Sequence, residues 1–272
     1  MTTIELKKGQ QVAPVVKVKK KSRIGKLILQ SGIIGWLFIL LVWQIASMFS
    51  EPMFLPSPYL TLIGAIEIAS DGTLFLYMGY SFLRVLAGWT LGLLIAVPFG
   101  LLIGTNKFVR ALFEPVINFV RFIPPLAFIT LFMLWFGIGE QSKVFLIVYA
   151  TFFVITINTL TGVLSISNDK LLSAKSMGAS KFQTLIYVVI PATIPYIFTG
   201  AKLAMGSSFM AIVGAEMVAA NEGIGFMIWN ARLYFKTDWI FVGLVVLGLM
   251  GFIMDRIFAY AGRKLLGRYK VV

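Results

Sequence analysis

The chain has 272 residues and a formal net charge of +13, with 59% hydrophobic but only 13% charged residues, a composition typical of a multi-pass membrane protein and not of a soluble domain. It contains no cysteine and no histidine, which excludes disulfides, the usual zinc and haem sites, and nucleophiles activated by histidine. No G-x-x-x-x-G-K-[ST] string occurs, so we expect no cofactor bound by this chain and no ATP held by a P-loop.

Six apolar stretches approach the length of about 20 residues that a membrane-spanning helix needs. They are residues 31–49, 82–103, 115–136, 144–165, 192–218 and 239–261. We therefore expect an all-α polytopic membrane protein with six transmembrane helices and a cytoplasmic loop between the fourth and fifth. The transmembrane domain would occupy residues 30–265, between a basic, disordered N-terminal tail at residues 1–29 and a short C-terminal tail at residues 266–272.

The 24 basic residues are concentrated in alternate connections between these stretches. Eight lie in the first 30 residues, two in residues 104–111, three in residues 166–190, and five between residue 256 and the end. The other connections hold only Lys143, Arg232 and Lys236. Because cytoplasmic loops carry the excess of Lys and Arg, we place both termini and the 166–190 loop in the cytoplasm. The charge then reflects contact with a lipid membrane, and we expect no nucleic-acid partner.

Prolines interrupt the chain after the first apolar stretch and within the third. The segment EPMFLPSPYL predicts an outer turn, which leads into a short interfacial helix at residues 59–70. Pro124 and Pro125 must kink or break the third helix. A broken helix is tolerated in a membrane only where protein or a water-filled cavity satisfies its backbone. The break is therefore a candidate part of a pathway through the membrane, and a kink needed only for packing is the alternative.

Charged residues inside apolar stretches are functional candidates, because a charge in the bilayer is costly. Arg121 precedes the proline pair, Lys202 is expected near the membrane midplane, and Glu216 lies toward the outer end of the fifth stretch, whereas Arg84 falls in the second. Arg121 and Lys202 could line an anion pathway. A structural role, with Lys202 paired to Glu216 or to backbone carbonyls, explains the same residues.

The first half of the 166–190 loop predicts a short helix with a sharp end. Asn168 or Asp169 would cap its start, and Gly178 would end it in the left-handed conformation that glycine adopts at low cost. The helical spacing predicts one apolar face, made of Leu171, Leu172, Ala174 and Met177.

The second half of the loop predicts another helix. Ser180 and Gln183 form a capping-box signature at its start, and Pro191 fits the first turn of the helix after it. The loop would present a compact helix to the cytoplasm, either as a docking surface for a partner or as an ordinary interfacial connector.

The loop also carries a recognisable spacing. Ala174, Gly178 and the Val188-x-Ile190-Pro191 segment resemble the cytoplasmic E-A-A-x-x-x-G-x(9)-I-x-L-P loop of ABC importer permeases, the segment that couples to the ATPase. The resemblance extends through FIPPLAFITLFMLWFGIGEQSK, AEMVAANEGIGFMIW and DWIFVGLVVLGLMGFIMDRIF. From about residue 30 onward the chain is similar to the nitrate/sulfonate/taurine/bicarbonate branch of binding-protein-dependent permeases.

One departure from the motif concerns its acidic residue. Leu172 and Ser173 occupy the positions of the glutamate and the first alanine. Coupling would therefore depend on shape, apolar contact and Lys175 or Lys181. The ATPase-coupling residues that the resemblance implies are Ala174, Lys175, Gly178, Ala179, Ser180 and Pro191. The pathway candidates are Arg121, Pro124, Pro125, Lys202 and Glu216.

The resemblance implies a transport subunit of the bacterial inner membrane that has no catalytic residues. Its partners would be cytoplasmic ATPase subunits that bind ATP and Mg, an extracytoplasmic substrate-binding protein and a second permease copy. The implied substrate is a small anion or zwitterion, with a vitamin precursor or an aromatic acid as the alternative. An ion-coupled secondary transporter usually needs embedded carboxylates or histidines, and only Glu216 is near such a position. A polytopic membrane enzyme is disfavoured by the lack of histidine, cysteine and paired carboxylates in the apolar stretches.

Overall fold

The computed structural model describes residues 33–267, and all regular structure in this range is helical. The predicted tail at residues 1–29 and most of the predicted tail at residues 266–272 lie outside the described residues. The elements are α2 (Ile33–Met48), α3 (Pro58–Ser70), α4 (Thr73–Thr105), α5 (Lys107–Val120), the 3₁₀ turn η1 (Pro125–Phe128), α6 (Ile129–Phe136), α7 (Glu140–Leu164), α8 (Asn168–Ser176), α9 (Lys181–Thr184), the π-helical turn η2 (Leu185–Val189), α10 (Ile190–Ala219), α11 (Ile224–Leu233) and α12 (Thr237–Leu266).

Four helical segments within residues 33–267 are long and apolar enough to cross a membrane, namely α4, α7, the continuous rod from α9 to α10, and α12. A fifth span results if α5 and the η1–α6 segment, which meet at an angle of 92°, count as one broken span. The first predicted span corresponds to α2, which has 16 described residues and is shorter than the roughly 20 residues that a full crossing needs. The short helix that the sequence predicts at residues 59–70 is present as α3; its place at the membrane interface stays a prediction.

Helices α4, α7 and α10 form the centre of the bundle, and small residues let α4 approach α7 closely. Gly88, Gly92, Ala96, Gly100 and Gly104 recur at every fourth position of α4, and all are buried. A Cβ atom at any of the four glycines would collide with a side chain of α7. These α7 side chains are Ile147, Thr151, Thr159 and Val163. In a membrane, helix association depends on such close packing because lipid is as apolar as the helices.

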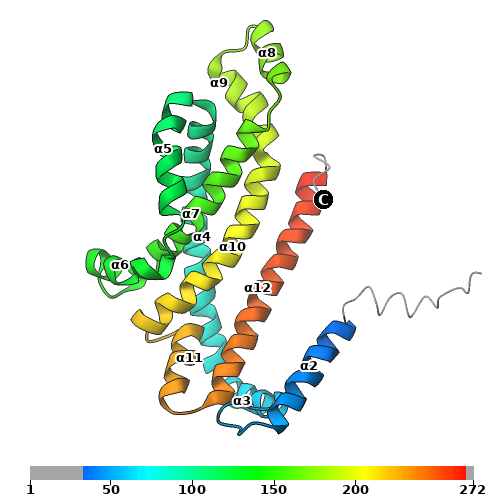
Figure 1. Cartoon of the computed structure of the whole chain (residues 1–272), viewed down its shortest axis with the longest axis vertical. Helices are drawn as coiled ribbons and strands as arrows, with labels where there is room; N and C mark the ends of the chain where they lie inside the picture. The colour runs from blue at the N-terminus through cyan, green and yellow to red at the C-terminus, as the bar shows by residue number, and fades with distance from the viewer. Residues whose placement is uncertain (1–32, 268–272) are drawn as a thin grey trace, which may run out of the picture.

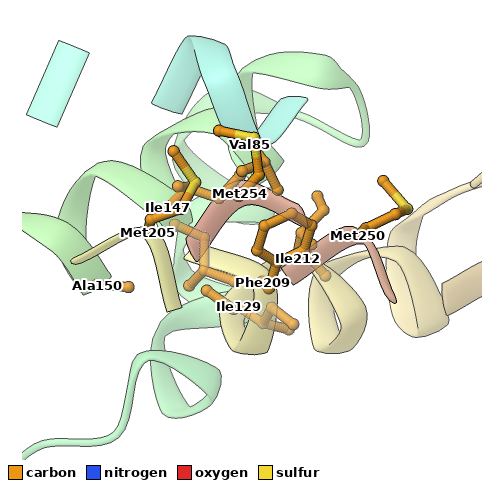
Figure 2. Close-up of a cluster of buried hydrophobic side chains, with 12 residues drawn as sticks. Val85, Ile129, Ile147, Ala150, Met205, Phe209, Ile212, Met250 and Met254 are labelled. Carbon is orange, nitrogen blue, oxygen red and sulfur yellow. The ribbon is translucent and has the colours of Figure 1, made fainter. Parts of the chain in front are cut away.

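A cluster of apolar side chains lies where α4, α7, α10 and α12 converge. Figure 2 shows Val85, Ile147, Phe209 and Ile212 packed together, with Met254 beside them. Val85, Ile147 and Ile212 have no exposed surface at all. The cluster therefore holds four helices that are far apart in the sequence.

The structure corrects two predicted boundaries. Helix α4 begins at Thr73, and only Asn106 separates it from α5, so the predicted basic loop at residues 104–111 is one turn residue followed by helix. The Asn106 side chain makes this turn possible because it accepts hydrogen bonds from the backbone N–H groups of Phe108 and Val109. Helix α12 runs on to Leu266, so Arg256, Arg263 and Lys264 lie on a helix and not in a tail.

The two ends of the bundle differ in what they present. Figure 1 shows α8 and α9 extending beyond one end, with the start of α5 and the last turns of α12 directed toward the same end, whereas α3 and α11 lie at the opposite end. Among the described residues, the start of α5, the 166–190 loop and the last turns of α12, which the charge pattern assigned to one side of the membrane, are thus directed toward one end of the molecule.

Candidate functional site

The proline pair breaks the third predicted span instead of kinking it. Helix α5 ends at Val120, Pro124 is extended, and the following helical segment turns away by 92°. The single hydrogen of the Tyr149 hydroxyl on α7 is shared between the carbonyl oxygens of Val120 and Ile123, which lie 3.0 and 3.2 Å from the hydroxyl oxygen. Protein therefore satisfies backbone groups that the break frees, as a broken helix within a membrane requires.

A hollow of about 550 Å³ lies beside this break, between the 121–126 segment, α7 and α10. Three of the predicted pathway residues, Arg121, Pro124 and Pro125, line it together. Most of its other lining side chains are apolar, and Asn158 and Ser207 add neutral polar groups. None of the described residues that line it is acidic. The hollow therefore combines one cation with an apolar wall.

Arg121 lies deep along α5 but is exposed. It follows Lys107 by 14 residues, or about 21 Å along a helix that rises 1.5 Å per residue. Its guanidinium lies over the Phe122 ring at 4.8 Å from the ring centroid, and none of the ion pairs among the described residues includes it. If the α5 and η1–α6 segments form a broken membrane span, an exposed charge at this position needs water or a ligand, because hydrocarbon cannot solvate it.

Glu216 does not line the hollow. Its side chain is fully buried near the C-terminal end of α10, where it accepts hydrogen bonds from the Arg84 guanidinium at 2.7 Å, the Ser81 hydroxyl and the Gly225 backbone N–H. The Ser81 hydroxyl in turn accepts a hydrogen bond from the N–H of Ile224. The carboxylate thus holds the start of α11 against α4 and α10, and the anticipated pairing with Lys202 is not found.

Arg84 joins this cluster to α7. It is 5% exposed and donates four hydrogen bonds: two to Glu140, at 2.6 and 2.8 Å, one to Glu216 and one to the Glu222 carbonyl oxygen. Glu140 also pairs with the buried Lys143 at 2.9 Å. The sequence showed Arg84 in an apolar stretch, but no role was predicted for it. The signals that could have identified its partners were Glu216 in the fifth apolar stretch and Glu140 just before the fourth.

Lys202 pairs with a different acidic residue. Its ammonium lies 2.9 Å from a carboxylate oxygen of Asp255 on α12, and the two side chains are 38% and 51% exposed. Lys202 does not line the hollow that contains Arg121. The structure thus separates two cations that were predicted to share one pathway.

The α8–α9 loop has the predicted break. Gly178 has φ +79, and the N–H groups of Gly178 and Ala179 bond to the carbonyl oxygens of Lys175 and Ala174. This pattern is a Schellman motif, which satisfies the last carbonyls of α8. Ser180 and Gln183 then form the predicted capping box at the start of α9. These local hydrogen bonds therefore determine the backbone conformation of the loop.

Three details of the loop differ from the prediction. Ser167, and not Asn168 or Asp169, occupies the cap position of α8, and its side chain makes no capping bond. The predicted apolar face is divided, because Ala174 is buried whereas Leu172 and Met177 are 58% and 80% exposed. Helix α9 also continues into α10 through η2. The π-helical turn thus carries the chain into Pro191, which lies in the first turn of α10 as predicted.

The chain matches the family described as "Binding-protein-dependent transport system inner membrane component" over residues 96–267. It is 34% identical over 230 residues to the taurine transport system permease protein TauC of Escherichia coli (strain K12), covering 82% of this chain and 84% of that protein. It is 32% identical over 231 residues to the nitrate import permease protein NrtB of Synechocystis sp., with coverage of 82% and 84%.

A solved structure of the MetNI methionine ABC transporter, described as inward facing, superimposes with a TM-score of 0.55 at 18% identity, covering 78% of this chain and 98% of that one. At this identity the likeness supports the fold alone. The chain therefore belongs to the family of binding-protein-dependent transport system inner membrane components and is an ABC importer permease subunit.

Proposed function

We propose that this chain forms, with a second copy of itself, the translocation pathway of an importer for a small anion or zwitterion of the nitrate, sulfonate/taurine or bicarbonate type. Curated relatives are named for taurine, aliphatic sulfonates and nitrate, which supports this part of the substrate range, and the Arg121 hollow offers positive charge to an anion. A vitamin precursor or an aromatic acid is the second candidate, because the wall of the hollow is mainly apolar. An extracytoplasmic binding protein would deliver the substrate.

The α8–α9 loop carries the proposal that cytoplasmic ATPase subunits dock on this chain. Leu172, Met177 and Phe182 are exposed at 58%, 80% and 71% in a loop that extends beyond the bundle. Lys175 and Lys181 are exposed beside them. These lysines could contact the ATPase in place of the motif glutamate, whose position Leu172 occupies. The partner would bind and hydrolyse ATP with Mg, and its closure would move the two loops and switch the pathway between inward-facing and outward-facing states.

The orientation that we propose follows from charge. The α8–α9 end carries Lys107, Arg110 and the three lysines of the loop, so it faces the cytoplasm, and the chain termini lie on the same side. Reporter fusions after residues 57 and 232 should report outside, and a fusion after residue 176 should report inside. The reverse pattern would contradict both the orientation and the docking surface.

The test of coupling uses two glycines with the same backbone conformation. Gly178 and Gly72 have φ of +79 and +82, and a Cβ atom added to either would have no neighbouring atom within 4 Å. A β-branched residue in this conformation is strained by about 1–2 kcal/mol, so Gly178→Val should distort the loop. We expect it to abolish ATP-driven uptake into proteoliposomes while the chain still inserts. The matched Gly72→Val variant, at the other end of the bundle, should retain uptake.

Copurification completes the test. The unaltered chain should purify together with its ATPase, whereas Gly178→Val should lose the ATPase or lose the coupling of its hydrolysis to transport. Normal uptake by Gly178→Val would contradict the docking role of the loop. Uptake with each purified binding protein encoded beside this chain would identify the substrate.

A further inference from the structure

The hollow beside the α5–α6 break has a chemical character that restricts what it can bind. A second hollow, of about 410 Å³ between α4, α10 and α12, is lined entirely by apolar and aromatic residues. The hollow at the break is open on one side and is also lined by rings and aliphatic chains, among them Phe153, Ile157 and Met210, but its lining includes Arg121. Its volume of about 550 Å³ is typical of sites for small organic molecules, which span about 300–1,000 Å³.

The positive charge of Arg121 is available to a ligand. Arg84, on the spanning helix α4, is neutralised by two carboxylates, whereas Arg121 contacts the Phe122 ring and enters none of the ion pairs among the described residues. A guanidinium binds carboxylate or sulfonate oxygens through two parallel hydrogen bonds. The anionic end of a ligand therefore belongs at Arg121.

The remaining polar groups of the hollow are neutral. The Tyr149 hydroxyl is engaged by the carbonyl oxygens of the helix break, and the Asn158 amide nitrogen donates to the Val154 carbonyl oxygen at 2.8 Å, so the amide oxygen of Asn158 can still accept a hydrogen bond. Ser207 contributes a hydroxyl. No carboxylate in the described lining could pair with an ammonium, so a zwitterion would leave its positive charge without a counter-ion.

Size separates the remaining anions. An inorganic anion such as nitrate would reach Arg121 but would leave the apolar wall in contact with water. An anion with an alkyl or aryl body would cover that wall, and each buried CH₂ group contributes about 0.8 kcal/mol. We propose that this hollow is a binding site within the permease for an organic monoanion, with Arg121 on its charged head and Phe153, Ile157 and Met210 around its apolar body.

This inference rests on the proposed function, because it concerns the same pathway, and it adds that the permease itself selects among the substrates delivered to it. The probes are benzenesulfonate, its neutral analogue benzenesulfonamide, nitrate and taurine. Binding to the purified complex of this chain with its ATPase in lipid nanodiscs is measured by equilibrium dialysis, without ATP and without binding protein, and partitioning into protein-free nanodiscs is subtracted.

We expect benzenesulfonate to bind at least tenfold more tightly than the other three probes. Arg121→Gln should weaken benzenesulfonate at least tenfold and leave benzenesulfonamide unchanged, whereas Arg121→Lys, which keeps the charge, should retain part of the preference. Arg232→Gln is the matched control, since Arg232 also lies over an aromatic ring, that of Trp229, and does not line the hollow. It should bind like the unaltered chain.

Several results would overturn the inference. They are equal binding of benzenesulfonate and benzenesulfonamide, tighter binding of nitrate or taurine than of benzenesulfonate, and benzenesulfonate binding that Arg121→Gln leaves intact. The melting temperature of each complex shows that the variants are folded. Failure here, in a complex that still performs ATP-driven uptake, would leave the proposed function standing. Failure to assemble with an ATPase would instead refute the proposed function.

Discussion

Arg84 and Arg121 both belong to the membrane-spanning bundle, but their surroundings are opposite. Arg84 is 5% exposed and is bonded to two carboxylates and a carbonyl oxygen. Arg121 is exposed, contacts an aromatic ring and borders a hollow. A guanidinium that is bonded to groups within the protein has few free donors for a substrate. An exposed guanidinium beside a cavity can donate hydrogen bonds to a bound ligand. Whether an arginine in a membrane protein has a structural or a functional role is therefore indicated by its bonding partners, and not by its position along the span alone.

The glycines near Arg84 show how completely that region is specified. Gly223 has φ +116, and a Cβ there would collide with the Glu216 carboxylate. A Cβ at Gly225 would meet the Val213 carbonyl oxygen. The chain between α10 and α11 thus closes tightly over the buried carboxylate. By contrast, the Arg121 side of the molecule is hollowed between α7 and α10.

The largest effect that we expect follows from removing the buried arginine. Arg84→Met would leave Glu216 as a buried carboxylate without a counter-ion, and breaking a buried pair in this way costs about 3–5 kcal/mol. The free energy of unfolding, measured by denaturant titration of the purified chain in detergent micelles, should fall by that amount. Arg121→Met should change it by no more than about 0.5 kcal/mol, as is usual for exposed positions.

A double variant checks the physical reason. Arg84→Met combined with Glu216→Gln removes both charges, so it should be more stable than Arg84→Met alone. Equal destabilisation by Arg84→Met and Arg121→Met would show that the contrast between the two arginines is not energetic.

The sequence predicted the loop better than the charge cluster, and the reason is physical. Gly178 and the Ser180–Gln183 capping box act over a few residues, so their local chemistry determines the break wherever the loop lies. The partners of Arg84 are 56 and 132 residues away along the chain. Composition and spacing cannot indicate which of several carboxylates reaches it until α4, α7 and α10 are packed.

The helix break was predicted in part. Pro124 and Pro125 indicate that a regular helix cannot continue. The bend of 92° depends on packing against other helices, including the contact of Tyr149 from α7, which follows Ile123 by 26 residues. The four-residue repeat of small residues in α4 was visible in the sequence and could have predicted the close α4–α7 contact.

An intermediate effect is expected at the helix break itself. Tyr149→Phe keeps the ring but removes the hydroxyl that donates to the Val120 and Ile123 carbonyl oxygens. The Val120 carbonyl oxygen still accepts the Ile123 N–H, so the change removes the Tyr149 partner of Ile123. Leaving one such group unsatisfied costs about 1–3 kcal/mol, which is less than the roughly 3–5 kcal/mol expected from Arg84→Met. The same denaturant titration measures it. We also expect the KM for uptake to rise, because the segment that carries Arg121 loses an anchor. Unchanged stability and KM would show that water replaces the hydroxyl fully.

The smallest effect should come from Lys202 and Asp255, whose surroundings lie between those of the two arginines. They form an ion pair at 2.9 Å, but both side chains are more than a third exposed. Pairs of this kind contribute about 0.2–1 kcal/mol. Lys202→Gln and Asp255→Asn should each lower the free energy of unfolding by less than about 1 kcal/mol, and the double variant should lose less than the sum of the two.

Uptake by the same variants distinguishes a scaffold role from a pathway role. Because Lys202 is already paired and does not border the Arg121 hollow, we expect Lys202→Gln to slow uptake into proteoliposomes less than Arg121→Gln does. Its effect should also be matched by Asp255→Asn, since either change breaks the same contact. If Lys202→Gln instead stopped uptake at unchanged stability while Asp255→Asn did not, the lysine would act on the substrate directly. The pathway would then extend from the hollow to the α10–α12 face.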